Sequence, residues 1–174
     1  MKREITPTNH ETLMDDHDFI VSKTDLKGRI TYANRVFMRI AGYSESELLG
    51  VQHNVIRHPD MPRGVFRLLW NVIESGQECF AYVKNLAKNG DFYWVYANVT
   101  VDYDASNQPI GYFSVRRKPS REGVAAVTPV YQEMLRIEQQ AGARDAPDAS
   151  VRWLTELLQE KGTTYEEFIH TLGH

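Results

Sequence analysis

Side chains that could hold a flat, charged ligand occur between positions 57 and 116 of the 174-residue sequence. Arg57, His58 and Asp60 lie together in an irregular stretch that is broken by prolines. A guanidinium can bind a phosphate or a ring carbonyl through two parallel hydrogen bonds. Trp70 follows in a helical pattern, where an indole could stack on an adenine or border a ring. Asn85 lies in an apolar strand pattern, so its amide must find partners.

Each candidate also has an ordinary structural explanation, and the sequence leaves both open. Asp60 could orient Arg57 or cap the helix that follows it. Trp70 could be a core residue. Two further candidates are weaker, because Asn98 is equally well explained by pairing within a sheet and Arg116 by a surface position on an edge strand.

Catalytic and metal chemistry have no support in the sequence. Carboxylates are scattered through turn and cap positions, and nothing pairs them as acid and base. No histidine or cysteine cluster has metal-ligand spacing, and no GxSxG, GxGxxG or P-loop motif is present. We therefore expect no enzymatic activity.

Composition and charge exclude further classes. The chain has 20 Lys+Arg and 23 Asp+Glu, and the resulting charge of −3 argues against nucleic-acid binding. The single cysteine, Cys79, cannot form an internal disulfide, which favours a reducing compartment. No stretch approaches the roughly 18 apolar residues of a membrane-spanning helix, and the N-terminal stretch is not a signal peptide. We expect a cytoplasmic protein without direct membrane insertion, which a partner could recruit to a membrane.

The hydrophobic pattern predicts an α+β domain over residues 19–118, after a flexible leader at 1–18 with a short helix over Glu11–His17. Strand-like and helix-like periods alternate, and an Asn-Gly turn joins the strands expected at 79–86 and 92–103. The order predicts helices packed on an antiparallel sheet. The expected strands are 19–24, 29–33, 79–86, 92–103 and 110–117, and the expected helices begin near 34, 44 and 62.

The C-terminal part is predicted to be a helical extension. It comprises a connecting helix at 119–141 that Pro129 should kink, a linker at 142–149 and a helical hairpin at 150–174. Each hairpin helix has one apolar face, which a pair of about 25 residues cannot bury alone. That face must pack on its own domain, on a second copy or on a transducer.

Several motifs carry a resemblance to a known family. Asp25–Asn34 and Gly42–Gly50, with the order of elements, resemble a PAS sensory domain. His53-Asn-Val-Ile-Arg-His-Pro-Asp-Met-Pro62, Val83-Lys-Asn and Lys88–Asn98 resemble the flavin-binding PAS domain of bacterial aerotaxis receptors. The resemblance implies a PAS fold: a five-stranded antiparallel sheet with short helices on one face.

The same resemblance implies a function. Aerotaxis-type domains carry FAD and report cellular redox state to a chemotaxis pathway. The chain looks like the soluble half of a two-piece energy-taxis system, with a methyl-accepting transducer as partner and a homodimer as an alternative.

The resemblance also assigns roles to residues. Asn85 matches the asparagine that binds the flavin ring, and Arg116 stands where light-sensing relatives carry a glutamine, so its cation would favour a reduced, anionic flavin. His53 replaces their reactive cysteine, which predicts no light-driven adduct. Cys79 stands where a tryptophan is expected, and this change could loosen the flavin slot.

Two rival functions remain in view. One is a cofactor-free PAS adaptor, which would be colourless. The other is a haem gas sensor with His53 or His58 as ligand, although neither lies on the helix at 62–75 where one haem-binding group places its histidine.

Overall fold

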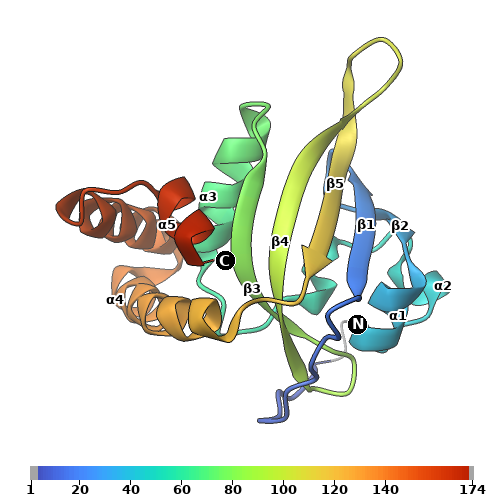
Figure 1. The fold of residues 1–174 in the computed structure, drawn as a ribbon, viewed down its shortest axis with the longest axis horizontal. Coiled ribbons are helices and arrows are strands. Elements are labelled where there is room, and N and C mark those ends of the chain that lie inside the picture. The colour runs from blue at the N-terminus through green and yellow to red at the C-terminus, as the bar shows by residue number, and fades with distance from the viewer. Residues whose placement is uncertain (1–3, 173–174) are drawn as a thin grey trace.

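The computed structural model describes residues 4–172 and contains a five-stranded sheet whose strand order is β2-β1-β5-β4-β3. All four strand pairs are antiparallel, as predicted. Figure 1 shows this sheet at the centre, with helices at both ends. The strands are β1 (Phe19–Asp25), β2 (Ile30–Ala33), β3 (Cys79–Leu86), β4 (Phe92–Tyr103) and β5 (Pro109–Arg117).

Short helices connect β2 to β3 and supply the wall opposite the sheet. Asn34 begins the first of them, because its side chain accepts hydrogen bonds from the backbone N–H of Phe37 and of Val21 on β1. The predicted capping box at Ser44 and Glu47 is present. These elements are α1 (Arg35–Ala41), α2 (Glu45–Leu48), the 3-10 helix η1 (His53–Ile56) and α3 (Arg63–Glu74).

The N-terminal segment runs along the turn that joins β3 to β4. The backbone N–H of Thr8 donates to Gly90, and Phe92 exchanges hydrogen bonds with His10 and Thr12. Met14 is buried in the core. The short helix expected over Glu11–His17 does not form, because backbone groups of this segment pair with the start of β4 instead.

The C-terminal extension differs from its prediction in where it bends. α4 (Arg121–Glu160) continues through Pro129 and breaks at Gly142, whose φ of 79° suits glycine. The linker predicted over 142–149 is therefore wrong beyond Gly142. Pro147 is tolerated there because the carbonyl it would leave unpaired, that of Ala143, accepts a hydrogen bond from the Arg63 guanidinium at 2.6 Å.

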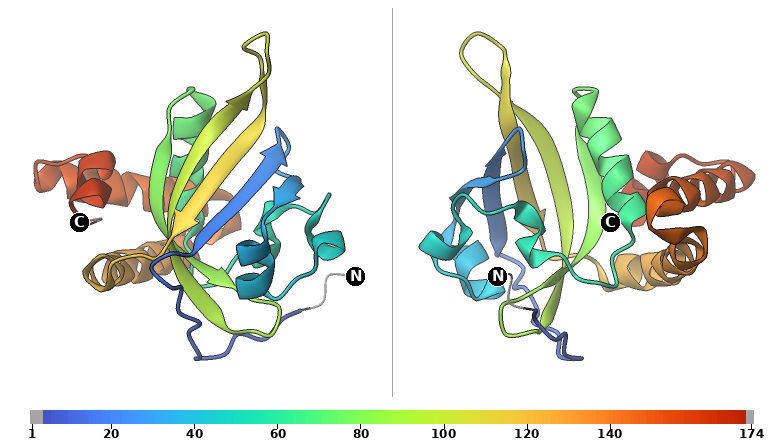
Figure 2. Two further views of the ribbon diagram at one scale, coloured as in Figure 1. Left: turned by 45° about the vertical axis from the view of Figure 1, so that its right-hand side comes forward. Right: turned by 180° about the vertical axis from the view of Figure 1, so that it is seen from behind.

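The extension packs on its own domain. Figures 1 and 2 show α4 and α5 (Tyr165–Leu172) beside α3 and β3, at the opposite end of the sheet from α1 and α2. Leu154, Leu158 and Ile169 are buried in the same apolar cluster as the sheet residues. Of the three partners weighed for these apolar faces, the chain's own domain is thus the one that covers them.

Hydroxyl groups of the extension cover the edge strand β3. The Tyr131 hydroxyl donates to the carbonyl of Tyr82 at 2.7 Å, and the Tyr165 hydroxyl donates to that of Phe80 at 3.1 Å. An edge strand otherwise presents unpaired backbone groups. The extension therefore supplies hydrogen-bond donors to carbonyl groups of β3 at the edge of the sheet.

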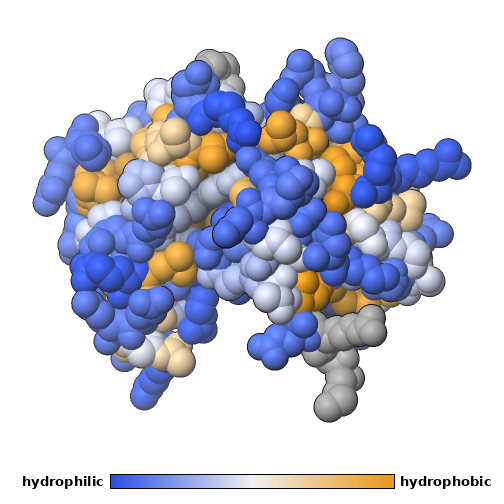
Figure 3. All heavy atoms as spheres, turned by 90° about the horizontal axis from the view of Figure 1, so that it is seen from below, coloured by the Kyte–Doolittle hydropathy of each residue, from blue (hydrophilic) through white to orange (hydrophobic). Residues whose placement is uncertain are grey.

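The surface is mainly polar, and Figure 3 shows separated apolar patches between charged side chains on one face. Within residues 4–172, no helix combines the length and the apolar composition that crossing a bilayer requires.

Candidate ligand-binding site

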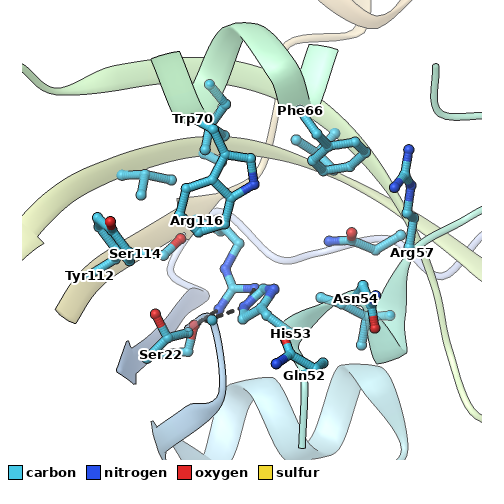
Figure 4. Close-up of a pocket in the computed structure, with 18 of the residues that line it drawn as sticks. Ser22, Gln52, His53, Asn54, Arg57, Phe66, Trp70, Tyr112, Ser114 and Arg116 are labelled. Atoms are coloured by element: carbon cyan, nitrogen blue, oxygen red, sulfur yellow. Dashed lines mark hydrogen bonds between the residues drawn. The ribbon is translucent and has the colours of Figure 1, made fainter. Parts of the chain in front are cut away.

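A cavity of about 270 Å³ lies between α3, the inner face of the sheet and the segment around η1. Ordinary ligand sites measure roughly 300–1,000 Å³, so this cavity can take a ring system of modest size. Figure 4 shows side chains that reach into it from both walls. Most of the lining is apolar or aromatic, and the polar exceptions include Ser22, Thr24, Gln52, His53, Asn54, Arg57, Asn85, Ser114 and Arg116.

The period of each element explains which residues meet at the cavity. Alternate residues of a strand share one face of the sheet, so Ser114 and Arg116 of β5 point inward together. Antiparallel register places Ser22 of β1 opposite Ser114 and Ala97 of β4 opposite Arg116. The helical wall follows a period of three to four, with Phe66, Leu69, Trp70 and Ile73 from α3.

Arg116 forms the polar floor of the cavity and is only 2% exposed. Its guanidinium donates to the Ser22 hydroxyl and to His53 Nε2, the latter at 3.2 Å, and lies over the Phe37 ring. The Nε group has no partner. Burial lowers the pKa of Arg116 to about 10, and the group therefore stays charged at neutral pH. Within residues 4–172, the side chains that accept hydrogen bonds from this cation, Ser22 and His53, are neutral.

His53 is neutral at this site. Burial, and then the charge of Arg116, lower its pKa to about 3. Because Nε2 accepts from Arg116, the ring proton belongs on Nδ1. The expected place of a reactive cysteine is thus taken by a neutral acceptor that helps to orient a cation.

Asn85 and Arg57 lie side by side on the wall between η1 and β3, where their backbones form an isolated antiparallel bridge. Asn85 is 4% exposed, and its Nδ2 group has no hydrogen-bond partner. The Arg57 guanidinium lies 4.3 Å from the centre of the Phe66 ring. Burial, and then the charge of Arg63, lower the pKa of Arg57, whereas Glu138 raises it.

Trp70 forms the roof of the cavity. It packs edge-on against Tyr112 of β5, with ring centres 5.1 Å apart. Figure 4 shows the indole descending from α3 toward Arg116. Four predicted residues, namely Arg57, Trp70, Asn85 and Arg116, are therefore brought together at one cavity.

Three predicted residues do not line it. His58 is buried, but its Nδ1 accepts from the backbone N–H of Asp60. The Asp60 carboxylate accepts from Lys84 at 2.7 Å and neither caps α3 nor pairs with Arg57. Asn98 donates to Glu78 at 3.1 Å. Asn98 thus has a structural partner, whereas neither of the two roles expected for Asp60 is present.

Other positions at the cavity carry no chemical signal in the sequence. Ser22 lies in an apolar strand pattern and becomes recognisable only when the register of β1 and β5 places it beside Arg116. Cys79 was expected to influence the width of the flavin slot, but it is not among the residues that line the cavity. Burial raises the pKa of its thiol to about 11. Among the described residues, no group of three or more His, Cys, Asp or Glu side chains could hold a metal ion.

The fold and its internal cavity define the class of protein. Residues 30–116, half of the chain, match the family described as the PAS fold, and the chain belongs to that family. Over 127 residues it is 40% identical to the aerotaxis receptor of Escherichia coli strain K12, a match that covers 73% of this chain and 25% of the receptor. The chain thus spans about a quarter of the length of that relative.

Solved structures agree on the fold. The dark structure of the blue-light photoreceptor Aureochrome1 LOV superposes with a TM-score of 0.51 and 26% identity, covering 71% of this chain and 84% of that one. A light-oxygen-voltage domain studied with a flavin analogue gives a TM-score of 0.53 at 21% identity, covering 71% of this chain and 87% of that domain.

Proposed function

We propose that this PAS domain is a cytoplasmic redox sensor that binds a flavin, specifically FAD, in the cavity beneath α3. The observation that carries the proposal is the pair of unsatisfied buried donors, Asn85 Nδ2 and Arg116 Nε, in the wall of the cavity. Buried polar groups are nearly always paired, so these donors point to a ligand that accepts hydrogen bonds.

The donor set fits a flavin. Its ring is flat and aromatic, which suits the space between Trp70 and the sheet, and its carbonyl and nitrogen acceptors suit the Asn85 amide and the Arg116 guanidinium. When bound, a flavin supplies reversible electron transfer. The preference for FAD over FMN rests on the resemblance to aerotaxis receptors, with Arg57 as the candidate phosphate ligand.

The chain's own residues would set the electrostatics of the site. Arg116 is a fixed, buried cation, and it stabilises negative charge on any group beside it. Neutral His53 and Ser22 hold that guanidinium in place. Trp70 and Phe66 exclude water, which strengthens the effect of the charge.

The absorption spectrum of the purified chain tests the proposal. A flavin spectrum supports it, and chromatography of the heat-released cofactor against FAD and FMN standards identifies the ligand. FMN alone would contradict the FAD assignment. A Soret band would instead favour a haem sensor, and a colourless protein that fails to bind added flavin would favour a cofactor-free adaptor.

The downstream partner belongs to the same proposal. A methyl-accepting transducer is the partner we infer from the 40% identity to an aerotaxis receptor. Co-purification with such a transducer under oxidising and reducing conditions tests the relay, and light scattering tests whether the chain forms a homodimer. Equal co-purification under both conditions would contradict a redox relay.

A further inference from the structure

We propose that the C-terminal extension is a clamp on α3 that couples the contents of the cavity to residues 143–172, with Glu138 as the positioning residue. The inference rests on the proposed function in one respect, because both require that the cavity binds a ligand.

The first amides of α3 are satisfied by the extension rather than by a local cap. Pro62 precedes the helix and offers no side-chain cap. Glu138 of α4 takes this role, because its carboxylate accepts from the backbone N–H of Arg63 at 3.0 Å and of Gly64 at 2.8 Å. A carboxylate is favoured at a helix N-terminus by the exposed N–H groups and the helix dipole. Glu138 is 8% exposed, so this contact is shielded from water.

The same carboxylate joins the two halves of α4. Ser150, which lies twelve residues further along, donates its hydroxyl to Glu138 at 2.7 Å. The break at Gly142 allows the chain to turn back so that both residues reach the start of α3. On the far side of the break, the carbonyl of Ala143 accepts from the Arg63 guanidinium. Both halves of α4 are therefore fixed to α3 at one point.

Gly64 of α3 packs closely against α4. A Cβ atom added to Gly64 would lie 2.1 Å from the Ser150 hydroxyl oxygen and 3.0 Å from the end of Met134. α3 therefore cannot shift toward the extension without displacing it. Figure 2 shows α3 between the sheet and the two halves of α4.

The opposite face of α3 is a wall of the cavity. Phe66, two residues after Gly64, and Trp70, one turn later, both line the cavity. Arg57 lies on the Phe66 ring and so contacts the same turn of α3 that Glu138 caps. A ligand that displaces this helix or competes for Arg57 must therefore act on the clamp.

A second contact joins the extension to another cavity wall. The Tyr131 hydroxyl holds the carbonyl of Tyr82, and the next residue of β3, Val83, lines the cavity. By contrast, the cavity residue Val99 lies on β4 and faces the opposite side of the sheet from Trp94, the β4 residue that stacks on Tyr131 of the extension. The coupling should therefore depend on which wall is perturbed.

Hydrogen exchange of the ligand-free full chain tests the clamp. Glu138→Gln should raise the exchange rates of residues 63–64 and 143–160 by about tenfold, because the charged acceptor is lost, and Glu138→Asp should restore part of the protection. Glu133→Gln is the matched control, since Glu133 pairs with Arg136 on the outer side of the same helix. Unchanged exchange in Glu138→Gln would overturn the clamp.

The coupling is tested by substitutions of residues that line the cavity and do not contact Glu138. In ligand-free protein, Trp70→Ala should raise exchange at 143–160, whereas Val99→Ala, which enlarges the same cavity from β4, should not. Equal exchange in the two variants would overturn the coupling even if the clamp exists.

Flavin provides the final comparison. In the flavin-bound wild-type chain, chemical reduction of the flavin should change the hydrogen-exchange rates of residues 143–160. In flavin-bound Glu138→Gln, reduction should leave these rates unchanged. The flavin absorption maximum should also differ between the wild type and Glu138→Gln. Identical exchange in oxidised and reduced wild-type protein would refute the coupling. If no flavin binds, the proposed function fails, and the two ligand-free experiments still decide the clamp.

Discussion

Replacing Arg116 with methionine should affect stability differently with and without an anionic ligand. Burial lowers the pKa of this guanidinium by more than two units, to about 10. Because one pKa unit corresponds to about 1.4 kcal/mol, the ligand-free fold carries a penalty of about 3 kcal/mol for the charge. The folded pKa lies below the unfolded one, so the penalty is fully present at neutral pH and is relieved only as the pH rises above about 10 toward the pKa of the unfolded chain.

Methionine removes this penalty and also both hydrogen bonds from Arg116, while the Ser22 hydroxyl and His53 Nε2 keep their contact with each other at 3.2 Å. A buried group that loses its partner costs about 1–3 kcal/mol. The ligand-free variant should therefore be between about 0 and 2 kcal/mol more stable than the wild type. In the presence of a ligand at 100 times its dissociation constant, the wild type gains about 2.7 kcal/mol, and the variant should lose most of that gain.

Urea unfolding at pH 7, with and without saturating FAD, measures both effects. Arg117→Met is the matched control, because this neighbouring arginine is exposed and its change should stay within about 0.5 kcal/mol in both states. A loss of more than about 2 kcal/mol in the ligand-free Arg116→Met protein would refute the reasoning, since Arg116 would then be a structural residue.

Three further predictions concern single residues. Asn85→Ala should weaken flavin binding about tenfold or more, because a buried donor is lost, while Asn98→Ala should leave the affinity unchanged. Titration of each apoprotein with flavin measures the two affinities. Equal affinities would show that Asn85 does not bind the flavin. Blue light should produce no cysteinyl adduct, because the resemblance places His53 where light-sensing relatives carry the reactive cysteine; reversible bleaching without photoreduction would contradict this. Tyr131→Phe should lower the free energy of unfolding by about 1 kcal/mol in urea titrations through loss of its bond to β3, and an unchanged midpoint would show that this contact is not stabilising.

Much of the fold could be predicted because its signals are local. The bounds of β3 and β4 coincide with the predicted 79–86 and 92–103, since a period of two and an Asn-Gly turn fix them together. The extension was harder, because proline and glycine are ambiguous within helices. Pro129 does not end α4, and Pro147 is accommodated only because Arg63, distant in sequence, takes the carbonyl that it leaves free.

The site could be predicted in part, for a related reason. Arg57 and Asn85 have side chains whose burial calls for partners, so they can be recognised singly. Ser22 and Glu138 cannot, because a serine in a strand and a glutamate in a helix are ordinary until the tertiary fold brings them to Arg116 and to the start of α3. Local patterns contain no information about such long-range hydrogen bonds.

The positions of the unsatisfied polar atoms support a ligand more strongly than the family resemblance does. Among the described residues, five buried side-chain polar atoms lack a partner, and three of them belong to cavity-lining residues, namely Thr24, Asn85 and Arg116. A chain optimised for stability alone would fill this space with apolar side chains, because each unpaired buried group costs free energy. A ligand that accepts from Asn85 and Arg116 removes that cost only while it is bound. The stability of α3 and of the extension attached to it should therefore depend on what the cavity contains.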